Sequence, residues 1–197
     1  MRKEKQEELN SYIEELKTIS KERLNQEATF IKGVPYRCTL ANGETIIREM
    51  LLKKNQERSA AVILPVTEEG NLLLIVEPRV FTERTVGIGF PAGYIENGED
   101  PKTGAIRELR EETGYKAEEM LELAKYYQDP GIGSAYNYGF LALGCKKVEK
   151  QDLDPTEYIH YMECTLEEAE ELVDKGYITG LQSQFLLEKA KPYIKRR

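Results

Sequence analysis

Residues 93–115 read GYIENGEDPKTGAIRELREETGY, and this stretch contains residues that typically begin and end a helix. Asp100 suits the N-cap, and Pro101 suits the first helical position, where its missing N–H costs nothing. Gly114 stands where a left-handed residue commonly ends a helix. The sequence therefore predicts a helix between Pro101 and Gly114.

Three glutamates lie on one side of this predicted helix. Glu108, Glu111 and Glu112 are spaced i, i+3 and i+4 and so fall within a sector of about 100°. Like charges at that spacing repel each other. A divalent cation would relieve the repulsion, and carboxylate oxygens are the ligands that Mg²⁺ and Mn²⁺ prefer. The alternative interpretation is an ordinary solvated helix that is rich in charge.

The opposite side of the helix carries Ile106, Leu109 and Thr113. We expect these side chains to pack on a core and to hold the acidic side outward in a fixed orientation.

The wider pattern is G-x5-E-x7-R-E-U-x-E-E-x-G-U, where U is a bulky apolar residue. It resembles the Nudix hydrolase box, with a tyrosine as a mild departure at the final apolar position. The matching residues are Gly93, Glu99, Arg107, Glu108, Leu109, Glu111, Glu112, Gly114 and Tyr115.

The resemblance implies a metal site. In Nudix enzymes the box forms a loop, a helix and a loop, and its glutamates bind metals that activate water and neutralise a diphosphate. Carried over to this sequence, Glu108 and Glu112 would be direct ligands of Mg²⁺ or Mn²⁺. Glu111 would be a ligand or would orient the attacking water, and the backbone carbonyl of Ala92 would be a further ligand.

Three other box residues would support that site. Arg107 would pair with a box carboxylate and position it, although a surface ion pair of little energetic value is the alternative. Glu99 would serve an outer metal or steady Arg107. Gly93 would let the backbone come close to metal and substrate.

Composition excludes several other classes. The chain has 197 residues, 40% of them hydrophobic and 32% charged, which suits one globular domain with an extension. A net charge of −7 disfavours a nucleic-acid binder. No run of 18 apolar residues and no signal peptide is visible, so we expect a cytoplasmic protein without a membrane span.

The cysteines and the histidine are too few and too widely spaced for a zinc site or a catalytic triad, which leaves a metal bound through oxygen ligands as the available chemistry. Cys38, Cys145 and Cys164 are widely spaced and form no CxxC motif, and His160 is the only histidine. Both a zinc site and a Ser-His-Asp triad are therefore improbable.

Periodicity predicts an α+β fold, an α/β/α sandwich with a mixed sheet between helices. A helix over residues 3–26 carries an apolar stripe that must find a partner in this core or in a second subunit. A hairpin over residues 36–54 turns at Asn42-Gly43. We expect an extension at 1–57 and a Nudix domain at 58–197. Predicted strands lie at 60–66, 71–79, 121–127, 138–145 and 157–164, and later helices at 166–175 and 179–194.

Over residues 36–190 the chain is similar to the ADP-ribose and nucleotide-sugar pyrophosphatase branch of the family. The shared features are the β segment before the core, the run NLLLIVEPRV followed by FPAGYIENGED, Pro130 at 15 residues beyond the box, and the late strand and helix. In that branch the early β segment commonly builds a dimer whose subunits share active sites. The late match falls on Glu157, as general base or late metal ligand, with a surface carboxylate as the alternative.

The sequence departs from the pattern of that branch at two places, and these departures leave the identity of the substrate's leaving group undetermined. Gly89 stands where that branch usually has a glutamate, and GIGSAYNYGF after Pro130 lacks the usual acidic residue. Arg79 and Arg84 are candidates for diphosphate recognition, with Arg79 favoured and a surface salt bridge as the alternative for each.

The resemblance implies metal-dependent hydrolysis of a nucleoside diphosphate linked to a sugar, such as ADP-ribose, by a cytoplasmic homodimer. The products would be a nucleoside monophosphate and a sugar phosphate. Two alternatives remain. One is a Nudix hydrolase of nucleoside triphosphates, dinucleoside polyphosphates or capped RNA, and the other is a sensing module that binds ligand without turnover.

Overall fold

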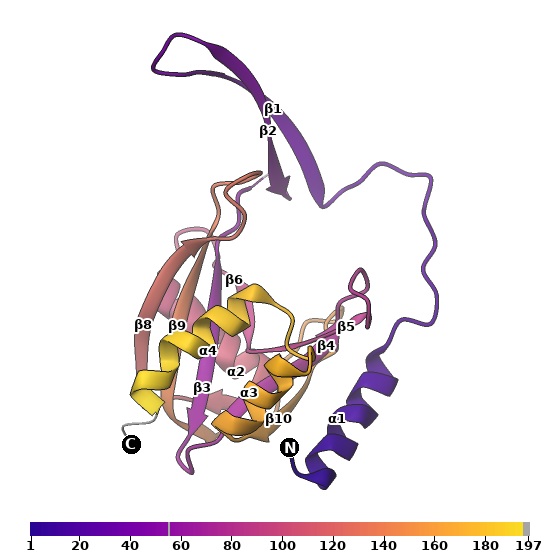
Figure 1. Ribbon diagram of the computed structural model, residues 1–197, viewed down its shortest axis with the longest axis vertical. Coiled ribbons are helices and arrows are strands. Elements are labelled where there is room, and N and C mark those ends of the chain that lie inside the picture. Colours follow the sequence, from indigo (N-terminus) through magenta and orange to yellow (C-terminus); the bar gives the residue numbers. More distant parts are fainter. Residues whose placement is uncertain (55, 195–197) are drawn as a thin grey trace.

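A mixed eight-stranded sheet forms the centre of the computed structural model, which describes residues 1–54 and 56–194 (Figure 1). Its strands run in the order β10-β4-β3-β9-β7, with β5 on β4, β6 on β3 and β8 on β9. The β3–β9 pair is parallel and the other pairs are antiparallel. The strands are β3 (Ala60–Thr67), β4 (Leu72–Pro78), β5 (Val86–Gly89), β6 (Ala92–Tyr94), β7 (Tyr115–Lys116), β8 (Glu119–Tyr127), β9 (Tyr136–Lys147) and β10 (His160–Cys164).

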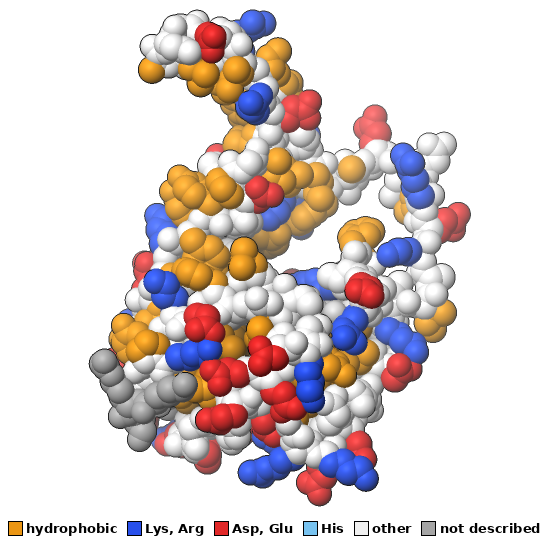
Figure 2. Space-filling model, in the orientation of Figure 1, with side chains coloured by type: hydrophobic (Ala, Val, Ile, Leu, Met, Phe, Trp, Pro, Cys, Tyr) orange, Lys and Arg blue, Asp and Glu red, His pale blue; other side chains and the backbone are white. Residues whose placement is uncertain are grey.

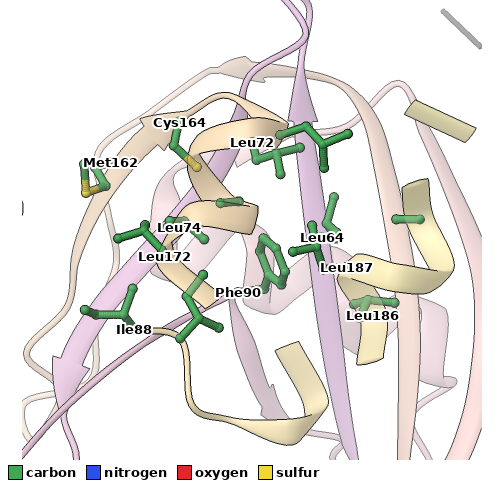
Figure 3. Close-up of a cluster of buried hydrophobic side chains, with 14 of the residues drawn as sticks. Leu64, Leu72, Leu74, Ile88, Phe90, Met162, Cys164, Leu172, Leu186 and Leu187 are labelled. Atoms are coloured by element: carbon green, nitrogen blue, oxygen red, sulfur yellow. The ribbon is translucent and has the colours of Figure 1, made fainter. Parts of the chain in front are cut away.

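Helices cover both faces of this sheet. The side chains of β3 alternate, so that Ala61 and Ile63 pack on the side of α2 (Pro101–Thr113) while Val62 and Leu64 pack on the other side. That other side is covered by α1 (Lys3–Leu16), α3 (Leu166–Asp174) and α4 (Leu181–Ile194). Figure 3 shows this larger cluster. The predicted α/β/α sandwich is confirmed.

The predicted hairpin is also confirmed, and it projects away from the sheet (Figure 1). Its strands are β1 (Ile31–Thr39) and β2 (Thr45–Lys53), so it begins five residues before the predicted residue 36. Gly43 has a φ of 87°, as the tight turn requires. Figure 2 shows hydrophobic side chains exposed along this projection. Tyr36, Leu40 and Ile47 of the hairpin are 46%, 42% and 60% exposed.

The N-terminal helix is shorter than predicted. It ends at Leu16 rather than near residue 26, because the apolar residues beyond it have no surface to bury against, and Ile19 is 95% exposed. Within the helix, Leu9 is completely buried in the core of this chain. The Tyr12 ring stacks on His160 of β10 with ring centroids 4.3 Å apart. The apolar stripe therefore finds its partner in this subunit.

No helix in the described part of the chain combines the length and the apolarity needed to cross a bilayer.

We predict that Leu9→Ala lowers the free energy of unfolding by about 2–5 kcal/mol, because it leaves a cavity in the core. The control is Ile19→Ala, which removes an exposed side chain and should change stability by less than about 0.5 kcal/mol. Urea denaturation measures both. Equal, small effects would show that α1 is not docked on the core.

Candidate active site

The box helix α2 has the ends that the sequence predicts. The Asp100 carboxylate accepts hydrogen bonds from the backbone N–H groups of Lys102 and Thr103, at 3.1 and 3.2 Å. Pro101 is the first helical residue. At the other end Gly114 has a φ of 71° and donates its N–H to the Arg110 carbonyl. These caps fix where the helix starts and stops.

The acidic side of α2 faces inward, contrary to the expectation from sequence. Glu108 and Glu112 are buried, whereas Ile106, which was expected in the core, is 45% exposed. Leu109 and Thr113 are buried as predicted. The helix is rotated toward β6 because Gly93 of that strand leaves room for a carboxylate.

The contact at Gly93 is close enough to exclude any side chain. A Cβ atom at this position would lie 2.0 Å from the Glu108 Cδ. Glycine is therefore required here because a carboxyl group occupies the space of its missing side chain.

Arg107 connects the box carboxylates. Its Nε and Nη2 donate to the two carboxylate oxygens of Glu99, each at 3.0 Å. Its Nη1 donates to Glu108 at 2.7 Å and to Glu111 at 2.9 Å, and its Nη2 also donates to the Tyr94 carbonyl at 3.0 Å. Hydrogen bonds from Arg107 hold the pKa of Glu99 below its usual value. Arg107 is thus part of a network rather than an isolated surface pair.

Glu112 is the most deeply buried of these acids. One of its carboxylate oxygens accepts a hydrogen bond from the Ala92 N–H at 3.0 Å. Burial, followed by the charges of Glu77 and Glu108, raises its pKa well above the usual 4.5. Burial likewise raises the pKa of Glu108 to about 6, against the opposing effect of Arg107.

Glu77 is a site residue that the sequence analysis missed. It lies at the end of β4, forms an ion pair with Arg79, and has a pKa raised by burial. The available signal was a carboxylate inside the otherwise apolar run NLLLIVEPR. Glu157 joins this group from the loop before β10, since its charge raises the pKa of Glu77, Glu108 and Glu112.

These residues line one cleft of about 1080 Å³. Of the residues singled out from sequence, the lining includes Arg79, Ala92, Gly93, Arg107, Glu108, Glu112 and Glu157. Glu111 and Glu99 do not line this cleft and reach it through Arg107. Arg84 also lies outside the lining, with its guanidinium 4.5 Å from the centre of the Tyr177 ring.

The donor set fits a hard divalent cation. Within residues 1–54 and 56–194, no three acidic, histidine or cysteine side chains form a ready-made metal cage. The hydrogen bonds from Arg107 and Ala92 take up oxygens of Glu108, Glu111 and Glu112. Even so, buried carboxylates that raise one another's pKa are an arrangement that a bound cation would stabilise.

Comparisons with known proteins agree with this geometry. Residues 56–185 match the family described as the NUDIX domain. A Bacillus subtilis protein called ADP-ribose pyrophosphatase is 33% identical over 88% of this chain and 91% of its own length. A Bacillus methanolicus methanol dehydrogenase activator is 34% identical over 66% of this chain and 68% of its own. A crystal structure of an ADP compounds hydrolase has the same fold, with a TM-score of 0.72, 24% identity, and coverage of 92% of this chain and 95% of that one.

We predict that Glu112→Gln raises the stability of the metal-free protein at neutral pH. Folding raises the pKa of Glu112 above 4.5, so the folded protein holds a proton that the unfolded chain releases as the pH rises. The stability due to this group is therefore present below pH 4.5 and is lost as the pH rises through the folded-state pKa.

Urea denaturation in EDTA between pH 4 and pH 8 measures this difference. The gain from Glu112→Gln should grow with pH and vanish toward pH 4, and added Mg²⁺ should stabilise mainly the unsubstituted protein. A variant that is less stable than the unsubstituted protein at every pH would contradict the account.

Proposed function

This chain belongs to the Nudix family and is a Nudix hydrolase, and we propose on that premise that it hydrolyses the diphosphate bond of a nucleoside diphosphate linked to a sugar. ADP-ribose, or a similar ADP-sugar, would give AMP or another nucleoside monophosphate together with a sugar phosphate. The observation that carries the proposal is the cleft in which Glu77, Glu108, Glu112 and Glu157 converge beside Arg79. The name of the Bacillus subtilis relative supports the choice of substrate class.

The box residues would hold Mg²⁺ or Mn²⁺. Glu108 and Glu112 would be its direct ligands, with Glu111 and the Ala92 carbonyl as further donors. When bound, the cation would lower the pKa of a water molecule and offset charge on the diphosphate. Arg107, itself held by Glu99, positions the Glu108 carboxylate.

Two other residues act on the substrate and on the attacking water. Glu157 lines the cleft, and its carboxylate is fixed by a hydrogen bond from the Asp154 N–H at 3.0 Å. In the proposal it takes the proton of the attacking water as general base. Arg79 donates to a phosphate oxygen in the proposal, because Arg79 lines the cleft, whereas the Arg84 guanidinium stacks on Tyr177 outside it.

A sensing module remains the second candidate. The Bacillus methanolicus relative is called a methanol dehydrogenase activator, a name that supports action through another protein. The two candidates differ in turnover, which the sensing module lacks.

We predict turnover of ADP-ribose or another ADP-sugar with Mg²⁺, and its loss with EDTA. Glu112→Gln should lower kcat by at least about 100-fold, because it removes a metal ligand that acts in the transition state. Phosphate release coupled through a phosphatase measures this across ADP-ribose, ADP-glucose, UDP-glucose, diadenosine polyphosphates and dNTPs.

The matched control is Glu122→Gln, an exposed carboxylate on β8, which should keep full activity. Unchanged activity in Glu112→Gln would remove the metal-site assignment. Ligand binding without turnover of any compound would favour the sensing module.

The hairpin supports a homodimer. A two-stranded hairpin is marginally stable in water when it stands alone, and this one exposes Tyr36, Leu40 and Ile47. A second copy of the chain that packs on these side chains would bury them. In this arrangement residues 1–57 form the extension and residues 58–197 the Nudix domain, although α1 packs on the core of its own subunit.

We predict that Ile47→Glu converts a dimer to a monomer, because it places a charge in the buried contact. Size-exclusion chromatography with light scattering measures the mass. The control is Ile106→Glu, at an isoleucine that is 45% exposed on α2, which should leave the dimer intact. A monomeric unsubstituted protein would contradict the proposal.

A cytoplasmic location stays a prediction from sequence. Cys38, Cys145 and Cys164 are all free thiols, which suits a reducing compartment.

A further inference from the structure

The cleft has a positive region that the sequence analysis did not identify. Lys53, at the end of β2, and Arg58, just before β3, both line the cleft. The Lys53 Nζ lies 5.2 Å from the centre of the Tyr94 ring, and the Arg58 Cζ lies 5.3 Å from it. Two cations are thus gathered on one aromatic side chain.

These two cations differ from the other cations of the cleft in what they contact. Arg79 is paired with Glu77, and Arg107 is bound to three glutamates. Among the residues that the structure describes, neither Lys53 nor Arg58 has a carboxylate within ion-pair distance. Because like charges repel, an anion between them would be stabilising.

The Arg58 guanidinium also has a donor without a partner. Its Nε is buried and makes no hydrogen bond to any described residue. A buried donor of this kind is costly, and each such group calls for an explanation. The hydrogen-bonding capacity of the Arg58 guanidinium is therefore not fully used by the described residues.

The surrounding residues hold the two cations in place. Arg58 has a φ of 52°, a left-handed conformation that a residue with a side chain adopts only when its surroundings fix it. Gln128 provides that support, since its Nε2 donates to the Arg58 carbonyl at 3.0 Å. The Gln128 Oε1 accepts a hydrogen bond from the Lys53 Nζ at 2.8 Å. One side chain therefore contacts the Lys53 ammonium and the Arg58 backbone.

This positive region adjoins the carboxylates. The backbone carbonyl of Tyr94, whose ring both cations contact, accepts a hydrogen bond from Arg107. Its neighbour Gly93 lies against Glu108. Consecutive Cα atoms are about 3.8 Å apart, so the two regions are within reach of one small ligand.

We propose that Arg58, assisted by Lys53, binds a phosphate group of the substrate's diphosphate on the Tyr94 side of the cleft. The inference rests on the proposed function, and it assigns a substrate contact to the segment between the hairpin and the Nudix core. Arginine suits this role because its planar fork binds two phosphate oxygens at once.

Isothermal titration of AMP and adenosine into the Mg²⁺-loaded protein tests the assignment, since neither is hydrolysed at a diphosphate bond. Arg58→Gln should weaken AMP binding at least about tenfold, the typical effect of a lost charge-assisted hydrogen bond, and leave adenosine binding unchanged. Lys53→Gln should weaken AMP binding less. Arg23→Gln, at an exposed residue outside the cleft, removes the same charge and should change neither.

Methylene diphosphonate, which lacks both base and hydrolysable bond, separates this inference from the proposed function. Its affinity should also fall in Arg58→Gln. If it does while no ADP-sugar is turned over, the phosphate subsite stands and the proposed substrate is wrong. Unchanged AMP and diphosphonate affinities in Arg58→Gln and Lys53→Gln, an equal loss for adenosine, or no binding to the unsubstituted protein would overturn the inference. Thermal unfolding checks that each variant is folded.

Discussion

The burial of several carboxylates against one another is the constraint on which the rest of the structure depends. Glu108 and Glu112 lie in the interface between α2 and β6, where lost hydration raises the pKa of both. Such groups destabilise a fold unless something offsets their charge. Arg107 does so in part, and Gly93 gives Glu108 its space. The energetic cost is understandable if the same oxygens bind a cation and, through it, a diphosphate.

The N-terminal segment supports this site from outside. His160, on which Tyr12 stacks, pairs with Val76 of β4, the residue before Glu77. Further along the segment, the Thr18 N–H donates to the Thr85 hydroxyl at 2.8 Å, and the Lys21 Nζ donates to the Val80 carbonyl at 3.0 Å. These contacts hold both ends of the loop that follows Arg79. The chain before the Nudix domain thus takes part in shaping the cleft.

The sequence predicted the parts of this molecule that local rules determine. The ends of α2 follow from Asp100, Pro101 and Gly114, and the buried strands follow from continuous apolar runs. It could not predict which side of α2 faces the sheet, because that depends on Gly93, a residue in another element. Arg58 was missed for the same reason, since only the folded sheet brings it to the cleft, whereas Glu77 had a sequence signal as the one carboxylate in an apolar run. The motif identified which glutamates belong to the site, but it could not predict that Glu108 and Glu112 are buried.

Proton release on binding of Mn²⁺ or Mg²⁺ shows whether the buried glutamates are metal ligands. It is obtained by isothermal titration at pH 6 in buffers of different ionisation enthalpy. Burial raises the pKa of Glu108 to about 6, so this carboxylate is partly protonated at pH 6, and burial also raises the pKa of Glu112 above its usual value. If the cation binds these two carboxylates, binding must displace protons. We expect proton release that declines as the pH is raised. Metal binding without proton release at pH 6, or no metal binding, would contradict this expectation.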